Sequence, residues 1–299
     1  MFGECHAHIF MDGVDYKKAA QAHCDCPDEK LIRQHLKQYQ EKGVSFVRDG
    51  GDRYGAGVLA RSIAGEYGIT YRTPVYAIHK KGHYGQIVGK EFETIKEYAD
   101  LVRGVRQNRG DFVKIMTSGI LDFNDHGTVT GKALERKEVF SMVKIAHEEG
   151  FHVMVHVNGP QAVIDAVEAG ADSIEHGNYQ NEESLSCMAE HKAVWVPTVV
   201  TVTNLIGSKR YEDEVLYKIM ETQEESLHCG YEKGVLMALG SDAGAYRVLH
   251  GQGIVDEYTQ FHRILGECPD LDEQLKAGEE RIRNLFQRDY PLQEQKAVY

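Results

Sequence analysis

The sequence lacks the features that mark membrane proteins and nucleic-acid-binding proteins. It has no apolar run long enough to cross a bilayer, no basic and then hydrophobic leader at its strand-like start, and no concentrated basic patch. The formal net charge of -12 repels phosphate backbones and anionic lipid surfaces. We therefore expect a cytoplasmic protein that acts on a small molecule and binds neither nucleic acid nor a membrane.

Cysteine is also sparse, with six residues scattered over the 299 positions. This distribution shows no framework of a small disulfide-bonded domain, and it favours reduced thiols. His23, Cys24 and Cys26 form the one cluster, but no second ligand pair follows at the spacing of a structural zinc site. We prefer a surface loop to a second metal site as the interpretation of this cluster.

Short apolar runs alternate along the chain with segments whose apolar residues recur at helical spacing. Several helical segments end at a glycine, as Pro27 to Lys42 does at Gly43. The other predicted helices are Lys132 to Glu149, Ala162 to Glu168 after Pro160, and Tyr211 to Lys233. The predicted strands are Phe2 to Ile9, Ser45 to Asp49, Thr70 to Ile78, Phe112 to Thr117, His152 to Val157, Ser173 to His176, Val194 to Thr201 and Leu236 to Ser241.

Eight strands that alternate with helices are typical of a (β/α)8 TIM barrel, for which about 250 residues is a usual length. An open, doubly wound α/β sheet is the alternative. Such a sheet binds its ligand at one switch point, whereas the candidate ligands here follow the first, fourth, fifth, sixth and eighth strands. We predict the α/β class and a TIM barrel that forms a single domain over residues 1–299.

The first strand carries two histidines, His6 and His8, separated by Ala7. Alternate side chains of a strand share a face, so both imidazoles can reach one metal ion. Taken alone, such a pair is more often two ordinary surface histidines. The metal-site interpretation therefore depends on further ligands elsewhere in the chain.

Lys114 lies within the apolar run Phe112 to Thr117, where an unpaired ammonium group is costly to bury. The simpler alternative is an ion pair with a neighbouring aspartate at the barrel mouth. Burial also lowers the pKa of a lysine, and the neutral amine can add carbon dioxide. The carbamate that results is carboxylate-like and can bridge two cations, which makes Lys114 a candidate metal ligand.

Three further candidates end predicted strands. His156 and His176 each follow an apolar run and precede a glycine-containing loop, so they can share one ion if their strands are adjacent. Asp242 closes the eighth predicted strand. It could cap the next helix, or it could take a proton from a metal-bound water and pass it to a leaving group.

This ordered set resembles the metal-dependent amidohydrolase superfamily, in its binuclear form with a carboxylated lysine on strand four. The resemblance extends from Gly3 to about Phe286, and it is closest to the branch of imidazolonepropionase-like enzymes and prolidase-like dipeptidases. Each phrase is moderately specific by itself, and their order strengthens the match. The phrases are His6-Ala7-His8, Val47 to Gly51 (VRDGG), Ala169 to Gly177 (AGADSIEHG) and Gly240 to Gly244 (GSDAG).

The resemblance implies two divalent metal ions, with zinc as the default, and a hydroxide between them. His6, His8 and Asp242 would hold one ion, His156 and His176 the other, and carbamylated Lys114 would bridge them. Asp242 would also shuttle the proton. In the family a glycine-histidine loop after strand three often reaches the substrate carbonyl, which nominates His83 for substrate contact. His250 lies in another family phrase, as a pocket residue or as a residue that orders its loop.

The sequence departs from the family at two places. Members usually carry a small β-sandwich built from residues before strand one and after helix eight, and the expected barrel lacks this flanking domain. The alternatives are a compact natural barrel, whose uncovered surface would form a homo-oligomer contact, and a partial chain. Asn158 follows the strand-five histidine where relatives often have another residue, which bears on substrate preference.

We expect a hydrolase that cleaves the C–N bond of a small amide, such as a dipeptide, an N-acyl amino acid or a cyclic amide. The alternatives are a lactone or ester hydrolase, a deaminase on the same fold, and a barrel scaffold without catalytic activity. Lys114 on strand four argues against the deaminase, which would typically use one metal ion and a glutamate.

Overall fold

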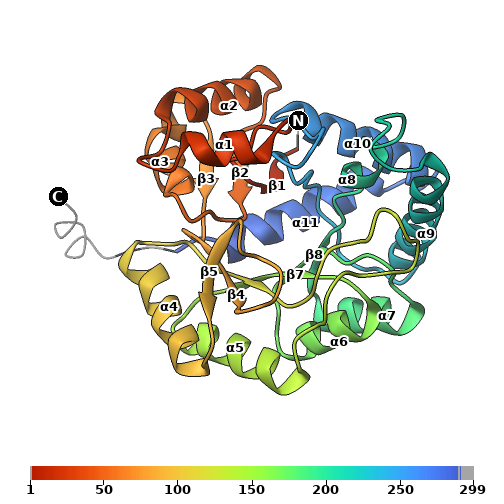
Figure 1. Ribbon diagram of the computed structural model, residues 1–299. Helices are drawn as coiled ribbons and strands as arrows, with labels where there is room; N and C mark the ends of the chain where they lie inside the picture. Colours follow the sequence, from red (N-terminus) through yellow and green to blue (C-terminus); the bar gives the residue numbers. More distant parts are fainter. Residues whose placement is uncertain (1, 289, 291–299) are drawn as a thin grey trace.

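The strands of the protein pair in parallel and form two sheets (Figure 1). The computed structural model describes residues 2–288 and residue 290. The first sheet has the order β1, β2, β3, and the second has the order β5, β4, β6, β7, β8, β9. The bounds are β1 Glu4–Ala7, β2 Phe46–Asp49, β3 Thr70–Arg72, β4 Ala77–Lys80, β5 Gly89–Phe92, β6 Val113–Met116, β7 Val153–Val157, β8 Ser173–His176 and β9 Val194–Val196.

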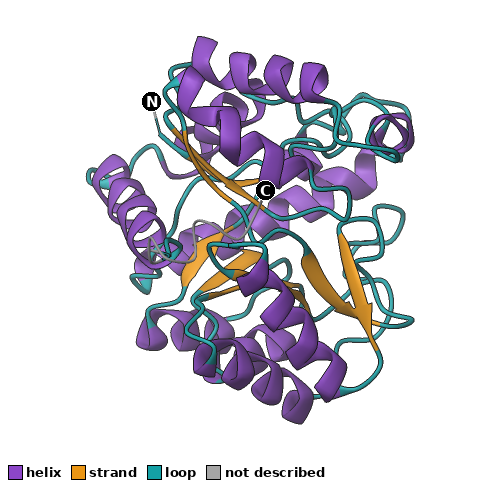
Figure 2. Ribbon diagram, turned by 90° about the vertical axis from the view of Figure 1, so that its left-hand side faces the viewer, coloured by secondary structure: helices purple, strands orange, loops and turns teal. Residues whose placement is uncertain are grey.

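Helices surround the strands, as two views of the molecule show (Figures 1 and 2). They pack against the outer face of the strands, while the inner face lines the interior of the molecule, so that all five residues of β7 are buried. In the described part of the chain, no helix has both the length and the apolar character needed to cross a membrane. The helices are α1 Tyr16–Ala22, α2 Glu29–Glu41, α3 Ala56–Ile63, α4 Ile95–Gln107, α5 Arg136–Glu148, α6 Pro160–Glu168, α7 Glu182–His191, α8 Val200–Thr203, α9 Asp213–Glu232, α10 Gln252–Leu265 and α11 Leu271–Leu285.

This arrangement confirms the predicted α/β fold of the TIM-barrel type, and the four predicted helices are present as α2, α5, α6 and α9. Their ends follow local chemistry. The side chain of Asp28 accepts a hydrogen bond from the N–H of Leu31 at the start of α2, and Gly43 adopts a positive φ of 72° just after its end. The prediction of one domain over residues 1–299 reaches beyond the described residues, and it stays a prediction.

The predicted third strand, Thr70 to Ile78, is wrong as a single element. It breaks into β3 and β4, which belong to different sheets. Pro74 has no N–H to donate, and Val75 adopts a left-handed φ of 71°, so the ladder is interrupted between the two strands. β4 then pairs with β6 and with β5, a strand that the sequence analysis did not predict.

The predicted eighth strand, Leu236 to Ser241, does not form a regular strand, yet it lies where a strand would lie. Its backbone is hydrogen-bonded to Trp195 of β9 and, through the carbonyl of Leu239, to the N–H of Cys5 in β1 at 3.0 Å. The carboxylate of Glu4 accepts the N–H of Ser241 at 2.7 Å, so a side chain takes the place of a ladder bond. The segment links the last strand of the second sheet to the first strand of the first sheet.

The predicted seventh strand, Val194 to Thr201, ends early at Val196, and its remainder includes the short helix α8. Glu257 causes this change of structure, because its buried carboxylate accepts the N–H groups of Val199 and Val200 at 3.0 and 2.9 Å. In a strand, the N–H groups of Val199 and Val200 would pair with a neighbouring strand. Here the side chain of Glu257 accepts them instead and caps the helix.

Candidate metal centre

His6, His8 and Asp242 form the tightest group of candidate ligands. The Nε2 atoms of both histidines lie 3.6 Å from Oδ1 of Asp242, and one ligand atom of each residue lies within 4.8 Å of the others. Asp242 reaches β1 because its N–H donates to the carbonyl of His6 at 2.8 Å. These distances suit three side chains that share one divalent ion.

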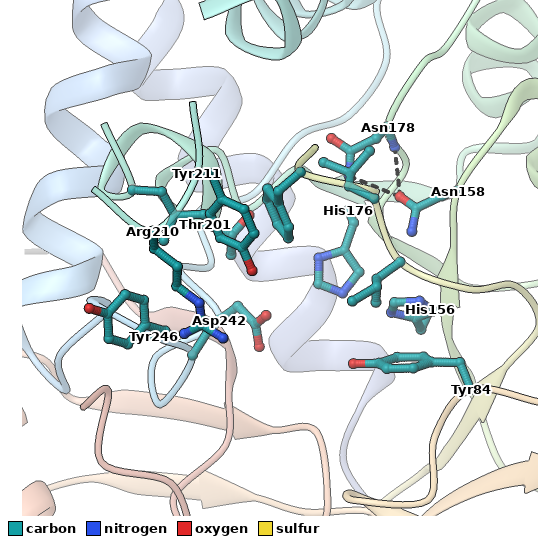
Figure 3. Close-up of a pocket in the computed structure, with 15 residues that line it drawn as sticks. Tyr84, His156, Asn158, His176, Asn178, Thr201, Arg210, Tyr211, Asp242 and Tyr246 are labelled. Atoms are coloured by element: carbon teal, nitrogen blue, oxygen red, sulfur yellow. Dashed lines mark hydrogen bonds between the residues drawn. The ribbon is translucent and has the colours of Figure 1, made fainter. Parts of the chain in front are cut away.

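His156 and His176 continue this group along the ends of the neighbouring strands. The ring centroids of His6 and His176 are 5.0 Å apart, and those of His176 and His156 are 4.7 Å apart. His156, His176 and Asp242 face one cavity, as Figure 3 shows. The fold thus brings two adjoining sets of ligand atoms together, in the order that the sequence predicts.

Hydrogen bonds outside the cluster orient the imidazole rings. Nδ1 of His8 lies 3.2 Å from the carbonyl of Gly51, and Nε2 of His156 lies 3.0 Å from the carbonyl of Gly119. A carbonyl oxygen can only accept, so these nitrogens donate and the other nitrogen of each ring keeps its lone pair. This arrangement of a second hydrogen bond behind each ring is typical of metal-ligating histidines.

Three buried atoms of the cluster have no hydrogen-bond partner among the described residues: Nε2 of His6, Nζ of Lys114 and Oδ1 of Asp242. An unpaired buried polar atom normally costs about 1–3 kcal/mol, and more when it is charged. Imidazole nitrogens and carboxylate oxygens are donors that divalent metals prefer. The residues present therefore fit a metal centre, which would satisfy His6 and Asp242 directly and Lys114 through a carbamate formed on its amine.

Lys114 lies in the middle of the cluster with 1% of its surface exposed. In the described part of the chain, its ammonium group forms neither a hydrogen bond nor an ion pair, so the simple ion pair with an aspartate is not formed. Burial lowers the pKa of Lys114 to about 8, against the opposing effect of Glu175 and Asp242. A larger share of neutral amine, the form that reacts with carbon dioxide, follows from this pKa.

Burial also shifts the pKa values of other members of the cluster. Burial, with a contribution from the nearby Lys114, lowers the pKa of both His8 and His156 to about 3. Burial raises the pKa of Asp242 to about 7, although Lys114 opposes this effect. These two histidines are therefore neutral near pH 7, as metal ligands must be, and Asp242 can readily accept and release a proton at this pH.

Two of the candidate ligands have backbone conformations that are unusual for residues with a side chain. His176 has a φ of 65° and Asp242 a φ of 59°. Left-handed conformations of this kind are unfavourable outside glycine, and they persist where surrounding structure enforces them. Both residues stand at the point where a strand-like segment turns into a loop of the cavity, so the turn aims the side chains inward.

A second layer of buried polar groups lies beneath the cluster. Oε2 of Glu175 lies 2.7 Å from Nδ1 of His6, while Oε1 accepts from Arg48 at 2.8 Å and from Ser173 at 2.5 Å. Arg48 also donates to the carbonyl of Cys5 at 2.7 Å. No role was predicted for Arg48 or Glu175 from the sequence, although charged residues within the buried strands β2 and β8 are a signal that could have found them.

Two adjoining cavities open at the candidate ligands. One of about 180 Å³ and a second of about 580 Å³ share His156, His176 and Asp242 in their walls. Tyr84 also lines both cavities, with its ring centroid 5.0 Å from that of His156. The ligand cluster thus lies at the junction of the two cavities. This position suits a substrate that has a different group on each side of the reacting bond.

His83, which was predicted to contact the substrate, lies outside the two cavities, whereas its neighbour Tyr84 lines them. Its Nδ1 lies 3.0 Å from the carbonyl of Lys132, and it is not among the residues that line either cavity. Tyr84, one position further along, lines both. The catalytic role of His83 stays a prediction, and Tyr84 is the residue of this loop that the structure brings to the candidate ligands.

Asn158 and His250 tie loops together. The side chain of Asn158 donates to the carbonyl of Gly119 at 2.9 Å and accepts from the side chain of Asn178 at 2.9 Å, a link drawn in Figure 3. His250 lies 2.7 Å from the carbonyl of Met11 and 3.0 Å from the hydroxyl of Tyr39. These contacts agree with a role of His250 in ordering the loop after β1.

The cysteine cluster shows no ligand geometry. Cys24 and Cys26 are exposed and free, whereas His23 is buried and its Nδ1 accepts the N–H of Asp28 at 2.9 Å. Among the described residues, the six cysteines form no disulfide, and the one possible His, Cys or carboxylate metal group is that of His6, His8 and Asp242.

The chain is similar in sequence to curated proteins over part of its length. An uncharacterized protein of Mycobacterium tuberculosis (strain ATCC 25618 / H37Rv) is 31% identical over 130 residues, which are 41% of this chain and 34% of that protein. Ochratoxinase of Aspergillus niger is 24% identical over 189 residues, which are 61% of this chain and 38% of that enzyme. The matched regions therefore span well under half of these curated relatives.

The solved structures show the same fold over nearly all of this chain. A Xaa-Pro dipeptidase with methionine bound in its active site superposes with a TM-score of 0.73 and 21% identity, over 94% of this chain and 75% of that one. The crystal structure of A. niger ochratoxinase gives a TM-score of 0.72 with 19% identity, over 92% of this chain and 69% of that one. The model of the Amidohydrolase family matches residues 2–281, and the protein therefore belongs to this family.

Proposed function

We propose that the protein is a metal-dependent hydrolase that cleaves the C–N bond of a small amide, such as a dipeptide, an N-acyl amino acid or a cyclic amide. The observation that carries the proposal is the group of three unpartnered buried atoms, on His6, Lys114 and Asp242, at the junction of two cavities. A protein interior rarely leaves such atoms unpaired, and two divalent ions bridged by a carbamate on Lys114 would pair them.

The ligands divide into two sets by position. His6 and His8 lie with Asp242, and His156 lies with His176, while Lys114 on β6 comes from the strand beside β7. Zinc is the default ion for such a donor set. Ions bound there would supply a water of lowered pKa and polarise the amide carbonyl.

Within this scheme the chain itself supplies proton transfer and orientation. Asp242, whose pKa burial raises to about 7, would take the proton of the attacking water and pass it to the leaving nitrogen. Glu175 would keep the ring of His6 oriented through its 2.7 Å hydrogen bond to Nδ1. Tyr84, at the junction of both cavities, is placed to contact the substrate.

The similar proteins support cleavage of an amide. The Xaa-Pro dipeptidase is named as a peptidase, and this chain shares its fold. Ochratoxinase resembles this chain both in sequence and in fold. Both likenesses favour the dipeptidase-like interpretation over the lactonase, the deaminase and the inactive scaffold.

Metal content and turnover in a Lys114→Ala variant test the proposal. Protein purified without chelator should contain about two ions per chain, and the variant should lose most of the metal and most of the amide hydrolysis. Lys80→Ala is the matched control, because Lys80 lies on the neighbouring strand β4 and is paired with Glu138 at 2.8 Å outside the cluster. A Lys114→Ala variant with full metal content and activity would overturn the carbamate bridge.

A substrate panel separates the remaining classes of reaction. Release of free amine and carboxylate from amides supports the proposal. Turnover confined to esters and lactones, release of ammonia from ring amines, or no turnover by fully metal-loaded protein would each replace it with one of the other classes.

A further inference from the structure

Two arginines at the wall of the larger cavity have no acidic partner among the residues that the structure describes. Arg53 and Arg210 both line this cavity, and Arg210 also lines the smaller one. Neither forms an ion pair with a carboxylate in the described part of the chain, in contrast to Arg48 with Glu175 and Arg263 with Glu224. Their positive charges are therefore free to meet a ligand.

The charge of the cavity walls is opposite to that of the whole protein. The chain carries a formal net charge of -12, yet Asp242 is the one carboxylate residue among the described residues that line the two cavities. Asp242 itself belongs to the candidate metal centre. A cationic mouth on an acidic protein attracts anions and concentrates them at the site.

Aromatic side chains hold Arg210 at the junction of the cavities. Its guanidinium carbon lies 4.6 Å from the ring centroid of Tyr246 and 5.5 Å from that of Tyr211. Figure 3 shows these three residues on one side of Asp242, with His156 and His176 on the other. A guanidinium that stacks on an aromatic ring uses its face, so contacts of this kind leave its in-plane N–H donors available for a planar anion such as a carboxylate.

The smaller cavity adds an apolar surface on the same side. Its wall contains Ile120, Leu121, Phe123 and Leu205, and the rings of Phe123 and Tyr211 are 5.2 Å apart. Such a surface suits an apolar or aromatic group of the ligand. An anion site, an apolar site and the candidate metal ligands thus meet within one pair of cavities.

We propose that Arg210, with Arg53 at the wall of the larger cavity, binds the carboxylate of the substrate. This inference rests on the proposed amide hydrolysis and narrows its substrate class. The substrates are N-acyl α-amino acids or dipeptides that have a free carboxylate and an apolar side chain, and cyclic or otherwise neutral amides are poor substrates. Arg210 contacts the substrate and determines specificity, while the chemistry stays with the metal ligands.

A matched pair of amides isolates the carboxylate. N-acetyl-L-phenylalanine and N-acetylphenethylamine share the amide and the aromatic ring, but the second compound lacks the carboxylate. We expect the wild-type protein to prefer the acid. Arg210→Met should lower kcat/KM for the acid by about 10- to 100-fold, as expected for a lost hydrogen bond to a charged group, and change kcat/KM for the neutral amide by less than about 3-fold.

Two further variants control this measurement. Arg210→Lys should keep part of the preference, because it retains the charge but not the planar pair of donors. Arg263→Met should keep all of it, because Arg263 is paired with Glu224 outside the cavities. Equal losses for both amides in Arg210→Met, or a wild-type protein that does not prefer the acid, would overturn the proposal.

A binding measurement separates this inference from the proposed reaction. In an Asp242→Asn background, calorimetry should show tighter binding of the acid than of the neutral amide, and Arg210→Met should abolish the difference. If this difference in binding is found but the wild-type protein hydrolyses no amide, the carboxylate site is supported and the proposed hydrolase activity is contradicted. If both compounds bind equally and the wild-type protein hydrolyses amides, the proposed hydrolase activity is supported and the carboxylate site is contradicted.

Discussion

Two sets of buried polar side chains lie next to each other at the strands, and they differ in how their atoms are paired. The ligand set contains buried atoms that have no hydrogen-bond partner among the described residues, and its members are His6, His8, Lys114, His156, His176 and Asp242. The supporting set has its charged groups bonded to one another and to the backbone, and its members are Glu4, Arg48, Ser173 and Glu175.

This difference in pairing separates the side chains that stabilise the fold from those that are available to a ligand. Buried polar groups in native proteins are almost always paired, so the supporting set meets the usual rule. The ligand set violates it at several atoms that converge on one point. Such a violation costs stability in the metal-free protein, and a bound metal would recover this cost on binding. Variants can test this division, because the two sets should respond in opposite ways.

The largest effect is expected from the supporting set. Arg48→Met removes the donors to Glu175, Ser173 and the carbonyl of Cys5, and leaves the buried carboxylate of Glu175 without its positively charged partner. The free energy of unfolding of the metal-free protein should fall by about 3–5 kcal/mol. Urea unfolding in the presence of a chelator measures this change.

Arg263→Met supplies the control for that measurement, because its ion pair with Glu224 is partly exposed at the surface. Loss of an exposed pair should change the free energy of unfolding by less than about 1 kcal/mol. If Arg48→Met lowered stability no more than this control does, the supporting set would have no special structural role.

A smaller and opposite effect is expected from the ligand set. Lys114→Met replaces a buried, unpaired ammonium group by an apolar side chain of similar length. In chelator, the free energy of unfolding should stay level or rise by up to about 3 kcal/mol. With free zinc at 100 times its dissociation constant, the wild-type protein should gain about 2.7 kcal/mol and the variant much less.

Urea unfolding with and without zinc gives both values from one series. A Lys114→Met variant that lost as much metal-free stability as Arg48→Met would place Lys114 in the supporting set. The proposed metal bridge would then have lost its main structural argument.

The smallest effect concerns a paired carboxylate away from the cluster. Burial would raise the pKa of Asp172, but its hydrogen bonds with His147 and His152 lower it to about 2. Because this pKa is below the unfolded value, the stabilisation is present above about pH 4 and is lost as the pH falls towards 2. We expect a contribution of about 1–2 kcal/mol, since both histidines are partly exposed.

Asp172→Asn checks the sign of this effect. Near pH 6 the variant should be less stable than the wild-type protein, and the difference should shrink as the pH approaches 2. Unfolding curves of both proteins over this range, with chelator present, give the difference directly. A difference that grew at low pH would mean that the pairing of Asp172 does not lower its pKa.

The sequence predicted the candidate ligands better than it predicted the elements that carry them. His6, Lys114, His156 and His176 stand in or at the end of short apolar runs that do form strands, and parallel strands bring their carboxyl ends together. Asp242 was found for the same reason, although its segment is not a regular strand. In that segment the carboxylate of Glu4 accepts the N–H of Ser241, which a regular strand would donate to a neighbouring strand. Glu4 is distant in sequence, so this interaction could not be predicted from the residues around Asp242.

Elements that depend on distant side chains were predicted incorrectly. The β-branched run from Val194 to Thr201 favours a strand, but Glu257 caps a helix within it from α10. Thr70 to Ile78 contains a visible proline, and the break between β3 and β4 could have been predicted from it. In the loop after β4, the glycine-histidine motif favoured His83 as the substrate contact, whereas Tyr84 is the residue that lines the cavities.

The class of fold and the residue types available for chemistry could be predicted from the sequence, because hydrophobic periodicity and donor atoms are local properties of the chain. The pairing of those atoms could be established only from the folded structure. It showed that Arg48 and Glu175 satisfy each other, that Lys114 has no protein partner among the described residues, and that Arg210 stands free at the cavities. Whether a buried polar atom is satisfied depends on which distant segment lies within about 3 Å of it, and only the folded chain sets that distance.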